Sequence, residues 1–309
     1  MKLYNQSQIK TSIVFIHNKK SSYMAPVIKQ AKLSNPDADI FIISTICSKN
    51  FYEKYGKFID INDYFDEASS FEKLYFHLSS LDYSLELIFI QRWFVLYSFM
   101  RINNLRHVVY LDSDCMLYHN VSSDWDYLNN YDFANLDKIW PAVTFFPSLL
   151  SISKFCDFLI YQYKKNLDYL KTRYKEEFLD KNIEGGIGDM SHFGMYHDMY
   201  NNIFDFSIII NNSTYDTNVN DSINSRRSFN DQSILAENKE GYLLNAISNI
   251  KKIFIHGKKP YGFLLVSNKK IYFKSIHFQG SSKKYIPYFY TGNIFQKLIY
   301  IRMFRKLGY

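Results

Sequence analysis

Residues 108–114 read Val-Val-Tyr-Leu-Asp-Ser-Asp, an apolar run that ends in two carboxylates. The run Val108 to Leu111 suits a buried strand of a parallel sheet, because such strands are covered on both faces. In an extended backbone Asp112 and Asp114 would point to the same side. Two such carboxylates can hold a hard divalent cation, and in open α/β sheets ligands gather where strands end. The stretch therefore predicts a metal and diphosphate site; the alternative is a turn in which Asp112 is a cap and Asp114 is solvated.

The sequence before this stretch alternates between strands and helices. Residues 13–16 predict a strand, 23–33 a helix and 40–44 a second strand, which together make a βαβ unit. A third short strand with a loop is expected at 57–65, and a helix from about 85 to 103 leads into the Asp-bearing strand. We therefore expect an α/β fold with a parallel sheet in the first half of the chain.

The second half of the sequence is less regular. Strands are predicted at 132–136, 142–146 and 207–210, helices at 153–175 and 190–200, and a polar surface loop at 211–227. Three of the 11 glycines fall within residues 185–188, which indicates backbone flexibility or close approach of a ligand.

The composition is that of a globular protein. The hydrophobic fraction of 47% excludes wholesale disorder, and 309 residues are enough to bury a substantial core. The three cysteines, Cys47, Cys115 and Cys156, are too few and too far apart for a disulfide framework or a zinc cluster, which favours a reducing compartment. The N-terminus lacks the pattern of a secretory signal, and the apolar runs are shorter than the roughly 20 residues needed to cross a bilayer. We expect a cytoplasmic protein.

Positive charge is concentrated at the C-terminal end. Residues 251–309 contain 13 Lys or Arg and no Asp or Glu, in a chain of net charge +7. This end is expected to face a diphosphate, an anionic phospholipid surface or nucleic acid. The pattern of residues 294–309 suits either a basic amphipathic helix at the inner face of a membrane or a helix docked on the core with a solvated basic face.

A second motif lies in this basic region. His277 is followed by Gly280 and Lys283 at intervals of three residues. A neutral imidazole can complete a metal shell, a glycine lets the backbone approach phosphate, and a lysine neutralises phosphate. All three roles serve one ligand, although a histidine after an apolar strand is also common as a purely structural residue.

Together the two motifs resemble those of metal-dependent nucleotide-sugar glycosyltransferases with the A-type (GT-A) fold. In that family an Asp-x-Asp motif at a strand end and a distant histidine hold manganese on the donor diphosphate. The closer resemblance is to the lipopolysaccharide galactosyltransferase and glycogenin-like group, whose late motif is His-x-x-Gly-x-x-Lys-Pro-Trp. The first three positions of that motif are matched here, but Lys284 and Tyr285 replace Pro and Trp. This departure leaves open whether the sugar configuration is retained or inverted.

The resemblance covers roughly residues 12–290 and implies a single GT-A-like catalytic domain at 1–290, with a mixed, mostly parallel central sheet flanked by helices. Its nucleotide-binding half would be 1–120 and its acceptor-side half 121–290, with a basic C-terminal helical segment at 291–309. The implied activity is a hexosyltransfer from a nucleoside diphosphate sugar, a UDP-sugar, to a hydroxyl of a glycan, lipid-linked or protein-linked acceptor. The implied cofactor is Mn²⁺ or Mg²⁺.

The resemblance also implies residue roles on the donor side. The metal ligands would be Asp112, Asp114 and His277. The donor would be contacted by six further residues: His17, Asn18, Arg92, Ser113, Gly280 and Lys283. The alternative for Arg92 is an ordinary salt bridge.

On the acceptor side, Asp189 resembles the residue that orients the sugar or accepts a proton, with Glu184 as a second candidate. Asp189 could equally be the N-cap of the helix 190–200. Asp231 and Gln232 resemble the Asp-Gln pair that this group places beside the reacting sugar, although a helix cap is again an alternative.

Two other functions stay open. A nucleotidyltransferase or phosphatase would use the same acidic pair, but usually needs more acidic ligands or a phosphate loop, and no G-x-x-x-x-G-K-[ST] motif occurs in the sequence. A basic nucleic-acid-binding protein would account for the C-terminal charge but leaves the Asp pair unexplained. We therefore expect no nucleic-acid partner.

Overall fold

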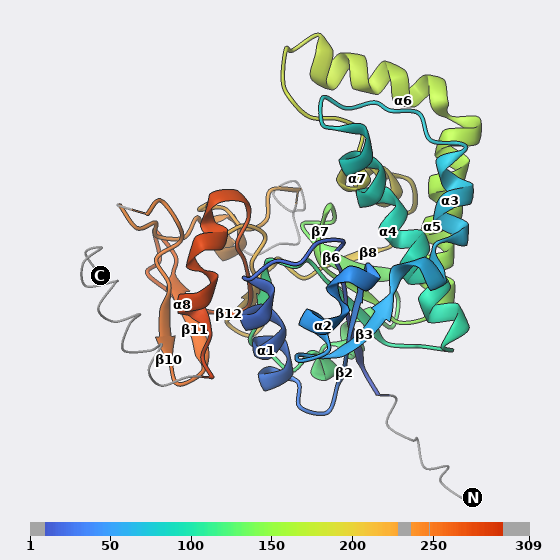
Figure 1. The fold of residues 1–309 in the computed structure, drawn as a ribbon. Helices are drawn as coiled ribbons and strands as arrows, with labels where there is room; N and C mark the ends of the chain where they lie inside the picture. The colour runs from blue at the N-terminus through green and yellow to red at the C-terminus, as the bar shows by residue number, and fades with distance from the viewer. Residues whose placement is uncertain (1–9, 228–235, 247, 293–309) are drawn as a thin grey trace, which may run out of the picture.

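The computed structural model describes residues 10–227, 236–246 and 248–292 of the chain. These residues form two β-sheets with helices packed around them (Figure 1). The larger sheet has seven strands, which in spatial order are β3 (Lys57–Asp60), β2 (Asp39–Ser44), β1 (Ser12–Ile16), β4 (Val108–Leu111), β7 (Trp140–Phe146), β6 (Phe133–Leu136) and β8 (Ile203–Asp205). Strand β7 is antiparallel to both of its neighbours, and all other adjacent strands in this sheet are parallel. The expected mixed, mostly parallel sheet is confirmed.

The apolar runs in this sheet are continuous because both faces are covered. In β1, Ile13 and Phe15 contribute to one hydrophobic core, whereas Val14 and Ile16 contribute to a second core on the opposite face. The strand order β3-β2-β1-β4 follows from three parallel crossovers: two step outward from β1 to β2 and β3, and the third returns to place β4 on the other side of β1.

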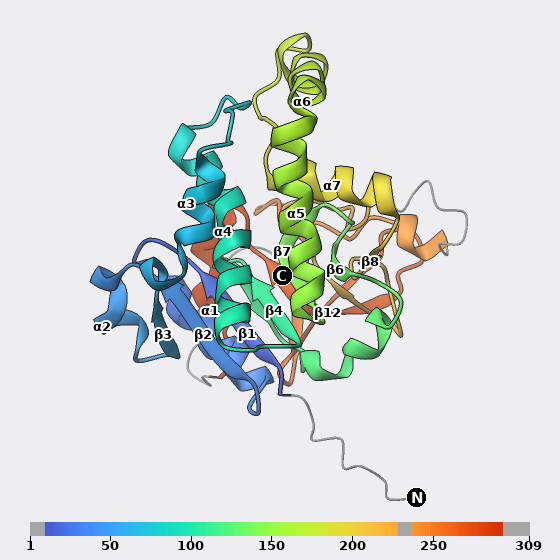
Figure 2. The same cartoon turned by 90° about the vertical axis from the view of Figure 1, so that its right-hand side faces the viewer.

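Helices cover both faces of the larger sheet. The helices of the described residues are α1 (Met24–Ser34), α2 (Lys49–Tyr52), α3 (Asp66–Glu72), α4 (Tyr83–Ile102), α5 (Leu149–Lys165), α6 (Leu167–Tyr174), α7 (Asp189–Tyr200) and α8 (Ile286–Phe289). Of these, α6 packs on α5 and extends beyond the sheet (Figure 2), and α8 packs against α1. Helices α3, α4, α5 and α7 share the second core with the sheet, and Figure 2 shows α4 and α5 in front of its strands. Helix α1 packs on the other face, beside the smaller sheet.

The smaller sheet lies next to α1 and α8 (Figure 1). Its strands are β10 (Phe254–His256), β11 (Lys259–Phe263), β12 (Lys270–His277), β5 (Cys115–Leu117) and β9 (Ser213–Tyr215), the last of which pairs with β12. Because β5 follows β4 after only three residues, the chain passes from the larger sheet into the smaller one at residues 112–114. The two sheets therefore meet at the Asp-bearing stretch.

The predicted helices at 23–33 and 85–103 correspond to α1 and α4. Helix α4 begins after Asp82, whose carboxylate accepts hydrogen bonds from the backbone amides of Ser84 and Leu85 at 3.0 and 3.1 Å. The predicted helix at 153–175 is two helices, α5 and α6, separated at Asn166.

Two predictions in the second half were wrong. The strand expected at 207–210 lies earlier, at β8, because the amide and hydroxyl of Ser207 bond to Asp205 Oδ1 at 2.7 and 2.6 Å and turn the chain. The segment 211–227, expected to be a surface loop, contains β9 and several buried residues, among them Asp216, which is 0% exposed. Its polar side chains can be buried because they hydrogen-bond to one another and to residues distant in the chain, Lys251 and His277.

Some expectations concern residues that lie outside the described ranges: Asp231, Gln232 and the basic segment 294–309. Among the residues that are described, no helix combines the length and the apolar character needed to span a membrane.

Candidate functional site

The Asp-bearing stretch forms the turn between the two sheets. After β4 ends at Leu111, the Asp112 amide donates to the carbonyl of Ala142 on β7 at 2.9 Å. The Cys115 amide then donates to the Asp112 carbonyl at 3.0 Å, and β5 begins. The two carboxylates therefore leave a short, hydrogen-bonded turn.

Strand pairing brings His277 to this turn. In the antiparallel ladder of β5 and β12, His277 lies opposite Cys115, and the Phe278 amide donates to the Asp114 carbonyl at 3.0 Å. As a result His277 Nε2 lies 3.4 Å from Asp114 Oδ1. One ligand atom from each of Asp112, Asp114 and His277 falls within 4.8 Å of the others. Three side chains separated by up to 165 residues thus form one cluster.

Opposite charges surround Asp114, which is 7% exposed. Burial alone would raise the pKa of this carboxyl, but His277 and Lys283 outweigh it and lower the pKa. Lys283 Nζ lies 3.0 Å from Asp114 Oδ2. Burial opposes the charge on His277 as well, yet the carboxylate of Asp114 raises the pKa of this imidazole. The alternative in which Asp114 is merely solvated is therefore wrong.

Arg92 joins the acidic pair to a third carboxylate. Its Nη1 donates to Asp112 Oδ1 at 2.8 Å and to the Tyr110 hydroxyl at 2.7 Å, while its Nη2 donates to Asp189 Oδ2 at 2.5 Å. The Tyr110 hydroxyl also donates to Asp112 Oδ1 at 2.6 Å. Arg92 thus does form salt bridges, but its two partners, Asp112 and Asp189, are themselves candidate site residues.

Asp189 begins helix α7 but does not cap it. The N-cap is Gly188, and the Asp189 carboxylate instead accepts from Arg92 and, at 3.2 Å, from the indole of Trp93. Burial raises the pKa of Asp189, although Arg92 opposes this effect. A buried carboxyl with a raised pKa is a candidate for accepting a proton.

A cleft of about 640 Å³ opens onto these groups. Nine of the residues singled out from the sequence line it: His17, Asn18, Arg92, Asp112, Ser113, Asp114, Asp189, His277 and Lys283. Apolar and aromatic side chains form the rest of its wall, including Leu85, Phe89, Trp140 and Met190. The volume is in the range of small-molecule and cofactor sites.

One end of the cleft is polar. His17 Nε2 lies 2.9 Å from the Ser21 hydroxyl, and burial, assisted by Lys283, lowers the pKa of this imidazole. Asn18 Oδ1 is buried and has no hydrogen-bond partner among the described residues. The Tyr23 hydroxyl lies 3.3 Å from that of Ser113. The unpaired oxygen of Asn18 is therefore available to a polar ligand.

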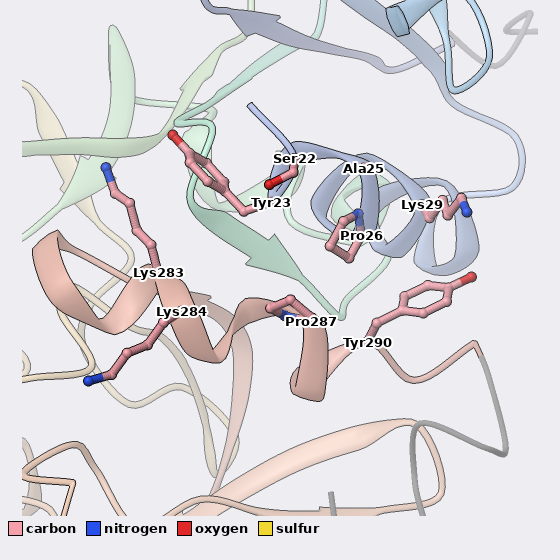
Figure 3. A pocket seen from close by; sticks show the side chains of 9 residues that line it. All are labelled: Ser22, Tyr23, Ala25, Pro26, Lys29, Lys283, Lys284, Pro287 and Tyr290. Carbon is pink, nitrogen blue, oxygen red and sulfur yellow. The ribbon is translucent and has the colours of Figure 1, made fainter. Parts of the chain in front are cut away.

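Tyr23 and Lys283 also border a second, smaller hollow of about 480 Å³ between the start of α1 and residues 283–290. Figure 3 shows the Lys283 side chain extending toward Tyr23, whereas Lys284 points away from it. Lys283 Nζ lies 5.6 Å from the centre of the Tyr23 ring. The aromatic ring thus helps to hold the lysine amine at the boundary of the two hollows.

Two predicted residues do not line the cleft. Gly280 follows the β12 strand with φ +62°, so it serves the turn after His277. Glu184 is exposed. Sequence reasoning in turn missed Tyr23, Tyr110, Trp93 and Trp140; only Tyr110, two residues before Asp112 in a strand, carried a signal, because alternate residues share a face.

Two carboxylates and an imidazole suit Mn²⁺ or another borderline divalent cation, since carboxylates are preferred by Mg²⁺ and Mn²⁺ and imidazole by transition metals. The spacing within 4.8 Å allows one ion to contact all three. The residues present therefore fit a divalent cation.

No protein-family model matches the sequence, and no curated protein matches it. Among solved structures, mouse xyloside xylosyltransferase 1 aligns over 65% of this chain and 86% of its own, with 11% identity and a TM-score of 0.45. The glycosyltransferase GlyE of Streptococcus pneumoniae aligns over 63% of this chain and 45% of its own, with 15% identity and a TM-score of 0.38. A cytidylyltransferase from Leptospira borgpetersenii aligns over 54% and 73%, with 11% identity and a TM-score of 0.31. Glycosyltransferases are thus among the structural neighbours, at similarities too low to assign a function.

Proposed function

We propose that this protein is a metal-dependent glycosyltransferase that moves a sugar from a nucleoside diphosphate donor to a hydroxyl of a glycan, lipid-linked or protein-linked acceptor. The observation that carries the proposal is the meeting of Asp112, Asp114, His277 and Lys283 at one cleft, where two sheets join. The sequence resemblance to GT-A enzymes adds the class of donor, with UDP-sugars as the first to test.

On the donor side, Asp112, Asp114 and His277 would hold Mn²⁺ or Mg²⁺. When bound, the cation acts as a Lewis acid that neutralises negative charge on the diphosphate as the sugar leaves. Lys283, whose amine lies 3.0 Å from the Asp114 carboxylate, would contribute a further positive charge beside the diphosphate. His17, Asn18 and Ser113 would contact the nucleoside end of the donor.

On the acceptor side, Asp189 would orient the reacting sugar or the acceptor hydroxyl. If the configuration is inverted, the Asp189 carboxylate would accept the proton of that hydroxyl. If it is retained, the leaving phosphate oxygen would take the proton, and Asp189 would only position the acceptor. In both cases Arg92 holds Asp189 and Asp112 in fixed relation, because it donates to both.

The test is a panel of nucleotide sugars in which release of nucleoside diphosphate is followed with Mn²⁺, with Mg²⁺ and with a chelator. We expect at least one donor to be turned over only in the presence of metal. Asp114→Asn should fold and lose this turnover by about 100-fold or more, since charge stabilisation in such sites is of that size. Asp124→Asn is the matched control, because Asp124 is also a buried carboxylate paired with a lysine but does not line the cleft.

Full activity in Asp114→Asn, or no release from any donor, would contradict the proposal. Pyrophosphate release from nucleoside triphosphates would instead indicate a nucleotidyltransferase, and inorganic phosphate from simple esters a phosphatase. Salt-sensitive binding of oligonucleotides without sugar release would indicate the nucleic-acid-binding alternative.

A further inference from the structure

We propose that Asp216 and Lys251 form a buried charge pair that positions His277 for its cation. This inference rests on the proposed function only for the presence of a divalent cation at Asp112, Asp114 and His277. The pair lies behind His277, away from the cleft, and neither residue lines it.

The segment 216–219 holds His277 at three points. Asp216 Oδ2 accepts a hydrogen bond from the His277 backbone amide at 3.1 Å. The Thr217 carbonyl lies 2.6 Å from His277 Nδ1, and the Val219 amide donates to the His277 carbonyl at 2.9 Å. Backbone and ring of His277 are thus fixed by three residues of one short segment.

The contact at the ring determines which nitrogen faces the cleft. A carbonyl oxygen can only accept, so Nδ1 must carry a proton and donate it to Thr217. This leaves Nε2, which lies 3.4 Å from Asp114 Oδ1, as the atom directed at the metal cluster. Histidines that bind metals commonly donate their other ring N–H to a carbonyl in this way, and the donor bond sets both ring orientation and basicity.

Lys251 fixes the segment through Asp216. Its amine pairs with Asp216 Oδ1, and both residues are 0% exposed. Lysine is almost never fully buried unless it is paired. The amine also donates to Asn224 Oδ1 at 3.1 Å and lies 5.1 Å from the centre of the Tyr242 ring. With Oδ1 taken by Lys251, Asp216 is held so that Oδ2 meets the His277 amide.

Asn224 ties the remaining part of the segment to the same lysine. Its Oδ1 accepts from the Thr217 amide at 3.0 Å, and its Nδ2 donates to the Tyr215 carbonyl at 2.8 Å. Thr217 therefore has two roles: its carbonyl accepts from His277 Nδ1–H, and its amide donates to Asn224. Asn224 in turn accepts a hydrogen bond from Lys251.

Fold stability alone is a weak explanation for such a pair. The desolvation cost of two buried ions roughly cancels their attraction, and apolar replacements of both are often tolerated. A role in placing His277 predicts an effect that stability does not, namely weaker binding of the cation in a protein that is still folded.

The experiment measures Mn²⁺ affinity of the full chain by the loss of the free Mn²⁺ signal in electron paramagnetic resonance. We expect Asp216→Asn and Lys251→Met each to weaken Mn²⁺ binding by about 10- to 100-fold, the usual effect of losing a contact behind a metal ligand. Lys274→Met is the matched control: Lys274 is on the same strand as His277, and its amine pairs with the buried Asp124 at 2.8 Å. This variant should lose stability but keep its Mn²⁺ affinity.

A double-mutant cycle separates positioning from general damage. In a His277→Ala background, Asp216→Asn should cause no further loss of Mn²⁺ affinity, because its effect passes through His277. Additive losses would overturn the inference, and so would a folded Lys251→Met protein with unchanged affinity. If the single variants fail to fold, the double variant Asp216→Asn with Lys251→Met carries no unpaired buried charge and should fold. Unchanged Mn²⁺ affinity in that double variant would also overturn the inference.

The outcome for the unaltered protein distinguishes the two proposals. If it binds no Mn²⁺ or Mg²⁺, the proposed function fails and this inference fails with it. If it binds Mn²⁺ and the cycle is additive, only the role of Asp216 and Lys251 is refuted.

Discussion

Replacing Arg92 with methionine is expected to cost about 3–5 kcal/mol of unfolding free energy at pH 7, the usual penalty for removing one partner of a buried ion pair. Arg92 is the partner of two carboxylates, at 2.8 Å for Asp112 and 2.5 Å for Asp189. Without Arg92, the indole of Trp93, at 3.2 Å, is the donor from helix α4 that remains to the Asp189 carboxylate. The cost is that of a buried carboxylate without its counterion.

The loss of stability should depend on pH in a definite direction. Burial already raises the pKa of Asp189, and Arg92 opposes this, so removal of Arg92 raises it further. A carboxyl group whose folded pKa lies above its unfolded value favours folding at low pH, and this contribution is lost as the pH rises through the folded pKa. The difference in unfolding free energy between the Arg92→Met variant and the unaltered protein should therefore be smaller at pH 5 than at pH 7.

The assay is urea unfolding at both pH values, followed by tryptophan fluorescence. Arg101→Met on the same helix is the control, because Arg101 pairs with Glu67 at the surface and should contribute less than about 1 kcal/mol. Combining Arg92→Met with Asp189→Asn should recover part of the lost unfolding free energy, since the unpaired carboxylate is removed. A cost below about 1 kcal/mol, or an equal cost at pH 5 and pH 7, would refute the reasoning.

Three further predictions concern stability. His192 is buried and burial lowers its pKa to about 4, so its contribution to stability should fall by about 3 kcal/mol as the pH drops from 6.5 to 4. His192→Gln should lack this component in urea unfolding across that range. Gly186→Ala should cost about 1–3 kcal/mol in thermal unfolding, because a Cβ would lie 2.3 Å from Ser79 Cβ; a neutral effect would contradict the close approach. Gly280→Ala should cost about 1–2 kcal/mol through its φ of +62° alone, and Gly280→Asn less, as measured by the same method.

The parts of the fold that follow from local pattern were predictable. The strand at 108–111 and the helices α1 and α4 are each specified by apolar spacing over a few turns or residues, and all three lie where expected. The meeting of the acidic pair with His277 was an expectation from motif resemblance. The structure supplies its physical basis in the pairing of β5 with β12, which no local pattern encodes.

The segment 211–227 shows where sequence reasoning fails. Its Asn- and Ser-rich composition is typical of a surface loop, yet Asp216 and Asn224 are buried. Their burial is possible because Lys251, from a separate part of the chain, satisfies both. Likewise, Arg92 and Asp189 are 97 residues apart, and their pairing depends on how α4 and α7 pack. Polar residues that are buried through distant partners cannot be distinguished from solvated ones by composition.

The site is supported by two separate buried charge networks. Arg92 from α4 fixes the acidic side, through Asp112, and the pair of Asp216 and Lys251 fixes the histidine side. Arg92 bonds to Tyr110 of β4 in the larger sheet, whereas Asp216 bonds to His277 of β12 in the smaller sheet. Among the described residues, Arg92 shares no hydrogen-bond partner with Asp216 or Lys251, so without a cation a change at Arg92 should add to a change at Asp216 or Lys251 in unfolding free energy. A bound cation would stabilise the folded state only to the extent that both sides are in place, so it would couple them.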